Sequence, residues 1–579
     1  MDRIKVFQVL IITATVIVLL RLIYWQFVKN LESRESSSVQ NDQIPAPRGD
    51  IYASDGFPLV TNQEAFLVYA KPNELKEKPE DIAKKLALFF ISEKYATSES
   101  NLSDEDQKNK EKEIEEKNKD LIKNLSNRNL FWVQLARKIP SLIKQKVEEQ
   151  KITGLDFERD EKRFYPEASM AAHLLGFAGS NKFGEVTGYF GLEGFYDRIL
   201  RGKAGRLGQE SDPFGFPILV GKYRPVEPKK GASLKTTIDR SIQFIVENKL
   251  KQAVEKYQAK EGTVIISDPK TGNILSMATY PNYQPALYSE YDEKLYKNSA
   301  VADTYEPGST FKLITIAAAL DLSIITPQTK CAVCTGPRQI GGFEISTWNK
   351  KYYPDSTMIE VIEHSDNIGM TFVADKLGID KFYDYITKFG FGKPTKIDLQ
   401  EEASGDIRAK DQWRPIDLAT ASFGQGIAVT PIQMIQAVGA IASGGKLLSP
   451  KVVTKIIDNG KEDNVKTSEG QVISLQTAVQ ITEMMVNAVE KGEARAFAPK
   501  GYRIAGKTGT AQIPVAGHYD PNKTIASFVG FAPADNPRFV MLVRFTEPSS
   551  SPFGSETAAP TFFAIAQELF NYFGISPSG

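Results

Sequence analysis

Three short motifs in this sequence carry residues that can perform acyl transfer through a serine. They are Ser-Thr-Phe-Lys at 309–312, Ser-Asp-Asn at 365–367 and Lys-Thr-Gly-Thr at 507–510. On a helix, a hydroxyl and an amine at positions i and i+3 share one face, so Ser309 and Lys312 are expected side by side. The Ser and the Asn of the second motif are expected on a loop beside them, and the third motif closes the site. Together the motifs predict a serine acyl-transfer site.

Each motif is weak evidence when taken alone. Ser-x-x-Lys also occurs at 141–144, 267–270 and 443–446, and Lys-Thr-Gly occurs again at 270–272. The copy at 267–272 joins two β-rich runs and consists of turn residues. It is therefore predicted to be a hairpin turn and not a site.

The surroundings of Ser309 favour it as the nucleophile. It follows Glu-Pro-Gly at 306–308 and opens an apolar run of helical length, which predicts a helix N-terminus. The helix dipole at this end favours negative charge developing on the serine oxygen. The alternative is a serine that only caps the helix.

Composition bounds the class of protein. With 579 residues, 41% of them hydrophobic and 25% charged, the chain is globular and too long for a single core, so two or more domains are expected. Lys plus Arg and Asp plus Glu are equal at 71 each, and no basic arm is visible. The balance gives no electrostatic reason to expect a nucleic-acid partner.

The N-terminus carries a predicted membrane helix. Residues 6–28 are apolar apart from a few polar side chains, and they are long enough to span a bilayer. Arg3 and Lys5 on the short preceding stub favour a cytoplasmic N-terminus. No small-x-small cleavage site follows the apolar stretch, so an uncleaved anchor is favoured over a signal peptide. The body of the protein is expected outside the cytoplasmic membrane.

The three motifs place the chemistry in the C-terminal part of the chain, and three parts are expected. Residues 1–30 form the stub and membrane helix, 31–230 a non-catalytic domain and 231–579 the catalytic domain. Within the non-catalytic domain, residues 104–129 are rich in Glu, Lys, Asp and Asn, which predicts a solvated helix or a disordered insert.

The catalytic part is predicted to be α+β, an antiparallel β-sheet flanked by helices. A helix is expected over 240–257, and the apolar runs that start near residues 504, 525 and 539 are expected to be neighbouring antiparallel strands. A helix over 564–572 closes the chain.

Several other residues have structural interpretations. Arg48 and Asp50 are expected to form an intramolecular ion pair. Cys331 and Cys334 are the only cysteines, and in an exported domain a short-loop disulfide is favoured over two free thiols. His173 is expected to be packed or hydrogen-bonded, because no pair of the three histidines has metal-ligand spacing. No metal and no other cofactor is expected.

A glycine-rich segment has two open interpretations. Gly424-Gln-Gly426 either shapes the back wall of the site or is a turn that lets strands pack closely.

The motifs and their order resemble those of class B, monofunctional penicillin-binding proteins. Further segments also resemble the family in family order, namely Arg-Gly-Asp-Ile at 48–51, Gly-Leu-Glu-Gly at 191–194, Thr-Ile-Asp-Arg at 237–240, Ala-Ser-Phe-Gly-Gln-Gly at 421–426 and Phe-Val-Gly-Phe at 528–531. The resemblance implies one membrane helix, an elongated non-catalytic pedestal and a penicillin-sensitive transpeptidase domain that cross-links peptidoglycan stem peptides. It also implies a partner, a polytopic glycan polymerase of the SEDS type.

The resemblance and the residue chemistry together assign roles to the motif residues. A neutral Lys312 takes the Ser309 proton as the serine attacks the penultimate D-Ala carbonyl. Ser365 relays a proton to the leaving D-Ala, Asn367 binds the donor peptide and Lys507 tunes the relay. The substrate-binding residues are those of the last motif, Thr508, Gly509 and Thr510. The backbone N–H groups of Ser309 and Thr510 are expected to form an oxyanion hole.

Two other classes of function share these features. A D,D-carboxypeptidase or β-lactamase carries the same motifs but passes the acyl group to water. A membrane anchor and a non-catalytic domain of about 200 residues are superfluous for such a hydrolase. A non-catalytic wall scaffold or β-lactam sensor is the second alternative, and the intact motifs argue against it. Elongation and division remain equally open as the setting.

Overall fold

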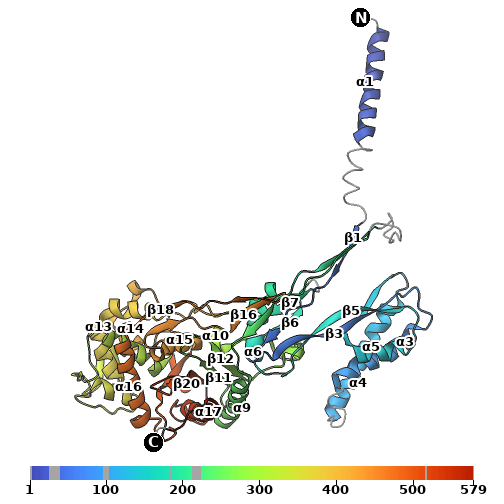
Figure 1. Ribbon diagram of the computed structural model, residues 1–579. Coiled ribbons are helices and arrows are strands. Elements are labelled where there is room, and N and C mark those ends of the chain that lie inside the picture. The colour runs from blue at the N-terminus through green and yellow to red at the C-terminus, as the bar shows by residue number, and fades with distance from the viewer. Residues whose placement is uncertain are drawn as a thin grey trace. The chain divides into compact units, whose positions relative to one another are not determined.

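The computed structural model describes residues 3–24, 39–95, 104–182, 185–210, 223–515 and 518–577. The chain forms two compact units and passes between them more than once (Figure 1). Unit 1 comprises residues 1–48, 65–160 and 201–231, and unit 2 comprises residues 49–64, 161–200 and 232–579.

The chain begins with helix α1 (Arg3–Ile23). Within the described residues, no helix combines the length and the apolar character needed to cross a membrane. Side chains are described only for residues 12–24 of the predicted membrane segment, so the rest of that prediction lies outside the described residues.

Besides α1, the described part of unit 1 contains two small β-structures and the helices α3, α4 and α5. Part of β3 pairs with β4 in antiparallel register, and β1, β8 and β9 form a separate three-stranded antiparallel sheet. The bounds are β1 (Val39–Ile44), β3 (Pro58–Ala70), α3 (Pro79–Tyr95), α4 (Asp104–Ser126), β4 (Val133–Pro140), α5 (Ser141–Glu148), β5 (Leu155–Phe164), β8 (Gly205–Glu210) and β9 (Tyr223–Val226).

The charged insert is a helix with one buried face. Helix α4 confirms the helical alternative, and most of its described side chains are exposed or half-buried, but the sequence analysis missed a buried stripe. Leu121 and Leu125 on α4 are fully buried in a core with Leu86 of α3. These two leucines are four residues apart and so share a face, which a composition dominated by charge obscures.

Unit 2 is built on a five-stranded antiparallel sheet in the order β12-β11-β21-β20-β19. The predicted sheet is therefore confirmed, and so is the hairpin at 267–272, which joins the first two strands. The bounds are β11 (Glu261–Ser267), β12 (Ile274–Tyr280), β19 (Ala505–Val515), β20 (His518–Ala532) and β21 (Phe539–Thr546).

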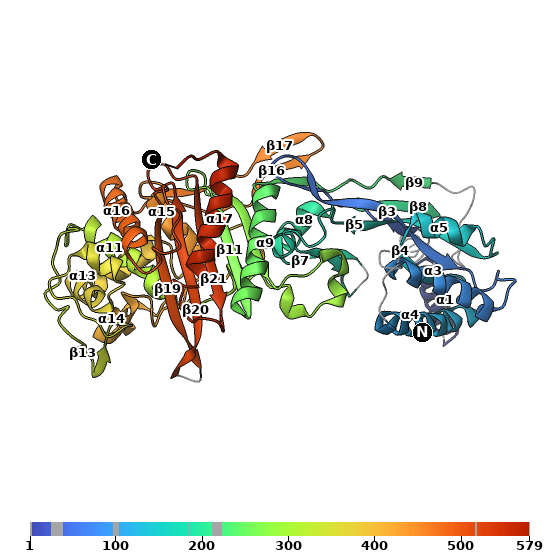
Figure 2. The ribbon, with the colours of Figure 1, turned by 90° about the horizontal axis from the view of Figure 1, so that it is seen from below.

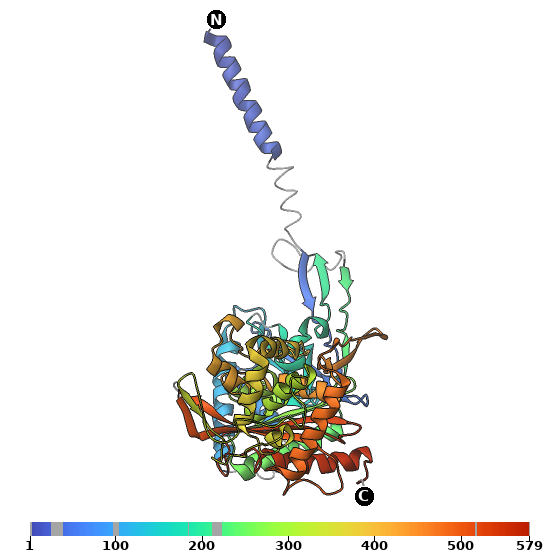
Figure 3. The same ribbon diagram turned by 90° about the vertical axis from the view of Figure 1, so that its left-hand side faces the viewer.

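Helices cover both faces of this sheet. Val264 and Ile266 face a core formed with α9 (Arg240–Tyr257) and α17 (Ala558–Phe573), whereas Ile265 between them faces the larger core. Successive strand residues point to opposite faces, so a continuous apolar run predicts a sheet buried on both sides. Helix α9 has the predicted bounds, and α17 begins six residues before the predicted closing helix. The green α9 and the red α17 lie on the same face of the sheet (Figures 2 and 3).

The larger core contains the helices that position the site. The central one is α11 (Lys312–Asp321), whose first nine residues are all buried. The others are α10 (Ser299–Ala302), α12 (Met358–Glu363), α13 (Asn367–Lys388), α14 (Pro415–Ala421), α15 (Pro431–Ala442) and α16 (Leu475–Lys491).

Smaller elements complete unit 2. Strands β17, β16, β10, β2 and the first part of β3 form a second sheet, in which only β10 and β2 are parallel. The bounds are β2 (Ile51–Tyr52), α6 (Ala172–Leu175), β6 (Phe177–Ser180), β7 (Val186–Tyr189), α7 (Gly191–Phe195), α8 (Asp197–Leu200), β10 (Ser233–Thr236), β13 (Arg338–Ile340), β14 (Phe343–Ile345), β15 (Lys446–Leu448), β16 (Val453–Asp458), β17 (Lys461–Asn464) and β18 (Glu469–Gln471).

Polar residues hold this part of unit 2 together. Asp50 accepts hydrogen bonds from the hydroxyls of Thr61, at 2.8 Å, and Tyr52, at 3.1 Å. Its predicted ion pair with Arg48 stays a prediction. An ion pair that the sequence analysis missed joins the buried Arg163 and Glu193 at 2.7 Å.

His173 is packed as predicted. Its ring meets Tyr283 edge to face, with centroids 5.4 Å apart. Burial lowers the pKa of His173 to about 4, because the charged imidazolium loses its hydration.

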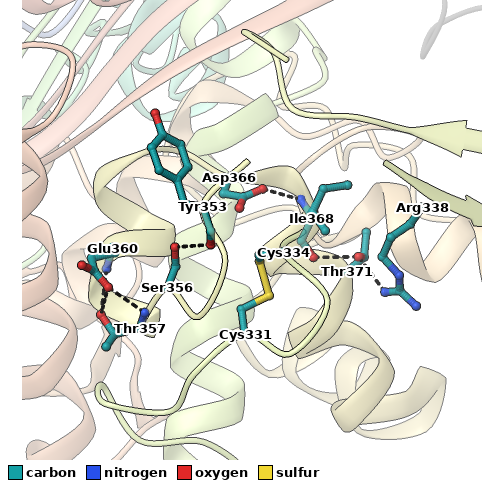
Figure 4. The surroundings of a disulfide bond; sticks show 10 residues. All are labelled: Cys331, Cys334, Arg338, Tyr353, Ser356, Thr357, Glu360, Asp366, Ile368 and Thr371. Atoms are coloured by element: carbon teal, nitrogen blue, oxygen red, sulfur yellow. Dashed lines mark hydrogen bonds between the residues drawn. A yellow bond between two sulfur atoms is a disulfide. The ribbon is translucent and has the colours of Figure 1, made fainter. Parts of the chain in front are cut away.

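The two cysteines form the predicted disulfide, Cys331–Cys334. Both sulfurs belong to the larger core, and the Cys331 N–H donates to the Ser356 carbonyl at 2.8 Å. Figure 4 shows the disulfide close to Asp366 and Ile368, which begin the helix α13.

Candidate active site

Ser309 lies at the start of a helix, as predicted. A 3₁₀ turn, η5 (Gly308–Phe311), leads directly into α11. Ser309 itself is half-buried, and its hydroxyl has no hydrogen-bond partner among the described residues. The hydroxyl is therefore free to meet a ligand.

Lys312 is a fully buried amine one turn further along. Its Nζ lies 2.5 Å from the Ser365 carbonyl oxygen, 2.8 Å from Asn367 Oδ1 and 3.3 Å from Ser365 Oγ. Burial lowers the pKa of Lys312 well below its ordinary value, and the nearby Lys507 lowers it further. The neutral amine is a proton acceptor, which is the form that a general base requires.

The second motif spans the link between α12 and α13. Ser365 has φ +54°, in the left-handed region that non-glycine residues rarely adopt. Asp366 caps α13 by accepting from the Ile368 N–H at 2.7 Å. Asn367 is the first residue of α13. The expected loop is thus correct for Ser365 and wrong for Asn367, because the Asp366 cap starts the helix one residue earlier than expected.

The third motif lies on β19, at the edge of the five-stranded sheet. Lys507 Nζ is 3.0 Å from Ser365 Oγ, 3.2 Å from the Thr508 carbonyl oxygen and 3.1 Å from Thr508 Oγ1. Burial lowers the pKa of Lys507 too, and the charge of Glu493 opposes this shift. Ser365 therefore lies between two buried amines, one from each of the other motifs.

Glycines allow the three motifs to approach one another. A Cβ on Gly509 would lie 2.5 Å from Ser527 Oγ and 2.9 Å from Thr310 Cγ2, next to the nucleophile. A Cβ on Gly308 would lie 3.0 Å from the Thr510 carbonyl oxygen. Close packing at these two glycines brings Thr510 beside the turn that carries Ser309.

The glycine-rich segment at 424–426 packs behind the nucleophile. The Gly308 N–H donates to the Gly424 carbonyl at 3.0 Å, and a Cβ on Gly424 would lie 2.2 Å from the Gly308 carbonyl oxygen. Gly424 also has φ +79°. This packing favours the back wall of the site over a turn that only lets strands pack closely, and the assignment stays a prediction.

The repeated motifs do not join this cluster. Ser141 begins α5 in unit 1, and Ser443 follows α15. Lys270 lies in the exposed hairpin turn and donates to Asn536. No described group of three or more His, Cys, Asp or Glu side chains is arranged to bind a metal ion.

Two acidic residues at the site were missed by the sequence analysis. Glu493 accepts from the Thr508 hydroxyl at 3.1 Å. Glu306 accepts from the Gly426 N–H at 3.0 Å and from the Tyr519 hydroxyl at 3.1 Å. The sequence could have pointed to Glu306, because it lies three residues before Ser309. Glu493 has no motif that could have revealed it, because its contact depends on packing between segments.

The fold and the site define a serine acyl-transfer enzyme, and the comparisons agree. Residues 262–567 match the penicillin binding protein transpeptidase domain, and residues 43–236 match the penicillin-binding protein dimerisation domain. The chain belongs to the penicillin-binding proteins with a transpeptidase domain, of class B.

Individual relatives extend over most of the chain. Stage V sporulation protein D of Bacillus subtilis is 34% identical over 96% of this chain and 83% of its own length. Peptidoglycan D,D-transpeptidase FtsI of Escherichia coli is 30% identical over 77% of this chain and 73% of its own. Penicillin binding protein 3 of Mycobacterium tuberculosis, solved with aztreonam, shares the fold with a TM-score of 0.69 at 24% identity, over 93% of this chain and 98% of that one.

Proposed function

We propose that this protein is a serine-type peptidoglycan D,D-transpeptidase of cell wall synthesis, acylated by β-lactams on Ser309. One observation carries the proposal. Two buried amines, Lys312 and Lys507, converge on Ser365 beside an open serine hydroxyl at a helix N-terminus. This arrangement places a base and a proton relay in hydrogen-bond contact, one helical turn from the nucleophile.

The first half of the reaction forms an acyl-enzyme. Neutral Lys312 takes the proton from Ser309 Oγ as the oxygen attacks the carbonyl carbon of the penultimate D-Ala. The backbone N–H groups of Ser309 and Thr510 stabilise the oxyanion, and such a donor typically contributes about 3 kcal/mol. Ser365 then passes a proton to the leaving nitrogen, the C–N bond breaks and the terminal D-Ala departs.

The second half transfers the acyl group to an amine of a neighbouring stem peptide. The amine attacks the ester carbonyl, its proton returns through Ser365 and Lys312, and Ser309 regains its hydrogen. Asn367 binds the donor peptide, while Thr508 and Thr510 receive the terminal carboxylate across Gly509. A β-lactam acylates the same serine, but its leaving nitrogen stays bonded to the acyl group. No separate product departs, so no space opens for the acceptor amine.

The setting of the enzyme is also part of the proposal. Residues 1–30 act as a cytoplasmic stub and single membrane anchor, 31–230 as a non-catalytic pedestal and 231–579 as the transpeptidase domain outside the cytoplasmic membrane. The apolar sequence of residues 6–28 supports the anchor. A SEDS-type polytopic glycan polymerase is the proposed partner, contacted through the membrane helix and the pedestal.

The test is labelling of purified membranes with a fluorescent penicillin. Intact protein and Ser267→Ala should be labelled equally, whereas Ser309→Ala should not be labelled. Labelling that persists in Ser309→Ala would contradict the proposal. The rate at which the intact acyl-enzyme loses its label then separates the two reactions, because a hydrolase frees Ser309 quickly in water and a transpeptidase holds the acyl group.

A further inference from the structure

A chain of hydrogen bonds leads from the buried lysines to an exposed carboxylate. Glu493 follows the C-terminus of α16, and its side chain is exposed. Thr508 Oγ1 lies 3.1 Å from Glu493 Oε2 and 3.1 Å from Lys507 Nζ. Lys507 in turn contacts Ser365, and Ser365 contacts Lys312. The reaction proposed above has no role for Glu493.

The chemistry of these groups fixes the direction of the bonds at Thr508. A carboxylate only accepts, so before substrate binds the single Thr508 hydroxyl hydrogen points to Glu493 and the Thr508 oxygen accepts from Lys507. Lys507 has three oxygen neighbours within 3.2 Å, one for each hydrogen of an ammonium. Ser365 Oγ accepts one of these hydrogens and lies 3.3 Å from Lys312 Nζ, to which its own hydrogen can point when that amine is neutral. An amine accepts a hydrogen bond only when it is neutral.

The charges around the two lysines act in the same direction as the hydrogen bonds. At Lys507, burial lowers the pKa and the Glu493 charge opposes this effect. At Lys312, burial and Lys507 lower the pKa, whereas Asp366 and Glu493 oppose them. Burial raises the pKa of Asp366 itself. Other ionisable groups on the surrounding elements include His364, which acts on Asp366, Glu363, which accepts from Asn487, and Glu490 in the last turn of α16.

We propose that Glu493 is a positioning residue of this site, whose carboxylate orients the Thr508 hydroxyl and holds the proton shared by the two amines on Lys507 rather than on Lys312. Two buried ammonium groups this close together repel each other, so a cation fixed at Lys507 keeps the other amine available as a base. Glu493 does not touch the reacting atoms and acts through Thr508. The inference rests on the proposed acyl transfer by Ser309.

The experiment measures the rate constant of acylation by a fluorescent penicillin from pH 5.5 to 9.5, with the full chain in detergent. Glu493→Gln keeps the size of the side chain and an oxygen for Thr508, but it has no charge. Because Glu493 favours the protonated form of both lysines, its removal should move both limbs of the pH profile to lower pH. A shift of about one pH unit makes the variant about tenfold slower on the alkaline limb and no slower on the acid limb.

Matched variants isolate the charge of Glu493. Glu490→Gln removes an exposed carboxylate from the last turn of α16 and should leave the profile unchanged. Glu493→Asp keeps the charge and should keep the position of the profile. Glu493→Ala also removes the charge and should show the shift of Glu493→Gln, which provides a second test if that variant does not fold.

The outcomes separate this inference from the proposed function. A Glu493→Gln profile that coincides with that of the intact protein, or that falls by one factor at every pH, would overturn the positioning role. Acylation of the intact protein at Ser309 would leave the proposed function standing in that case. An intact protein that is not acylated at Ser309 at any pH would overturn both.

Discussion

Lys507 Nζ lies 3.0 Å from Ser365 Oγ, although the two residues are 142 positions apart in the sequence. Ser365 reaches this position from a link with φ +54°, a backbone conformation that costs energy for any residue except glycine. Strain held in place by the surrounding structure is typical of functional sites, because it fixes a side chain that relaxed backbone would place elsewhere.

Removal of the Ser365 hydroxyl should therefore slow acylation strongly. In Ser365→Ala, Lys507 loses an acceptor and the leaving group loses its proton relay, and such a relay typically contributes about 10²- to 10⁴-fold. The second-order rate constant with a fluorescent penicillin measures this loss. Ser443→Ala, a serine of one repeated motif outside the site, is the control and should react normally. A Ser365→Ala rate within twofold of the intact protein would refute the relay.

The close approach of Gly424 to Gly308 should make Gly424 irreplaceable. In Gly424→Ala, the new Cβ would lie 2.2 Å from the Gly308 carbonyl oxygen, so the turn that carries Ser309 must move. Gly426→Ala is the matched control, because Gly426 has a similar φ of +72° but its nearest neighbour would be 3.4 Å away, at Thr420 Oγ1. Gly426→Ala should cost about 1 kcal/mol of backbone strain, whereas Gly424→Ala should cost more and lose penicillin labelling. Thermal unfolding and labelling of both variants decide this, and equal behaviour of the two would contradict the back-wall assignment.

Much of unit 2 could be predicted because its signals are local. The turn residues at 267–272 predict the hairpin, and the apolar runs of β19, β20 and β21 predict adjacent strands. Helix α9 was predicted with its correct bounds, since Asp239 supplies a cap at its start. The motifs themselves identify the residues that gather at the site.

The parts that were missed depend on contacts between distant segments. Glu493 and Thr508 are 15 residues apart, and Glu306 and Tyr519 are 213 apart, so neither pair has a local pattern. The buried face of α4 was missed for a different reason. Its apolar residues are few among many charges, and only packing against α3 shows that they form one stripe.

The disulfide should stabilise unit 2 moderately. It closes a very short loop, for which the loss of chain entropy in the unfolded state corresponds to about 2 kcal/mol. The variant with both Cys331→Ser and Cys334→Ser should lose about this amount, measured by thermal unfolding against the intact oxidised protein. Treatment of the intact protein with a reductant should lower its unfolding temperature towards that of the variant. Two free thiols in the denatured, unreduced protein would show that the bond does not form.

The buried Lys312 amine should make stability depend on pH. Its pKa is lowered in the folded state and is about 10.4 in an unfolded chain, so between these values the unfolded state binds a proton that the folded state does not. The free energy of unfolding therefore rises with pH across this window, by up to about 1.4 kcal/mol per pH unit. In Lys312→Met, which cannot titrate, this contribution is absent.

The measurement compares unfolding of the intact protein and Lys312→Met at pH 7 and pH 9. The stability of the intact protein relative to the variant should increase at the higher pH, because the difference cancels groups that titrate in both proteins. Lys270→Met removes an exposed amine from the hairpin turn, away from the site, and is the control for replacing a lysine by methionine. A pH-independent difference for Lys312→Met would mean that Lys312 stays protonated when folded, and the amine could then not serve as the base for Ser309.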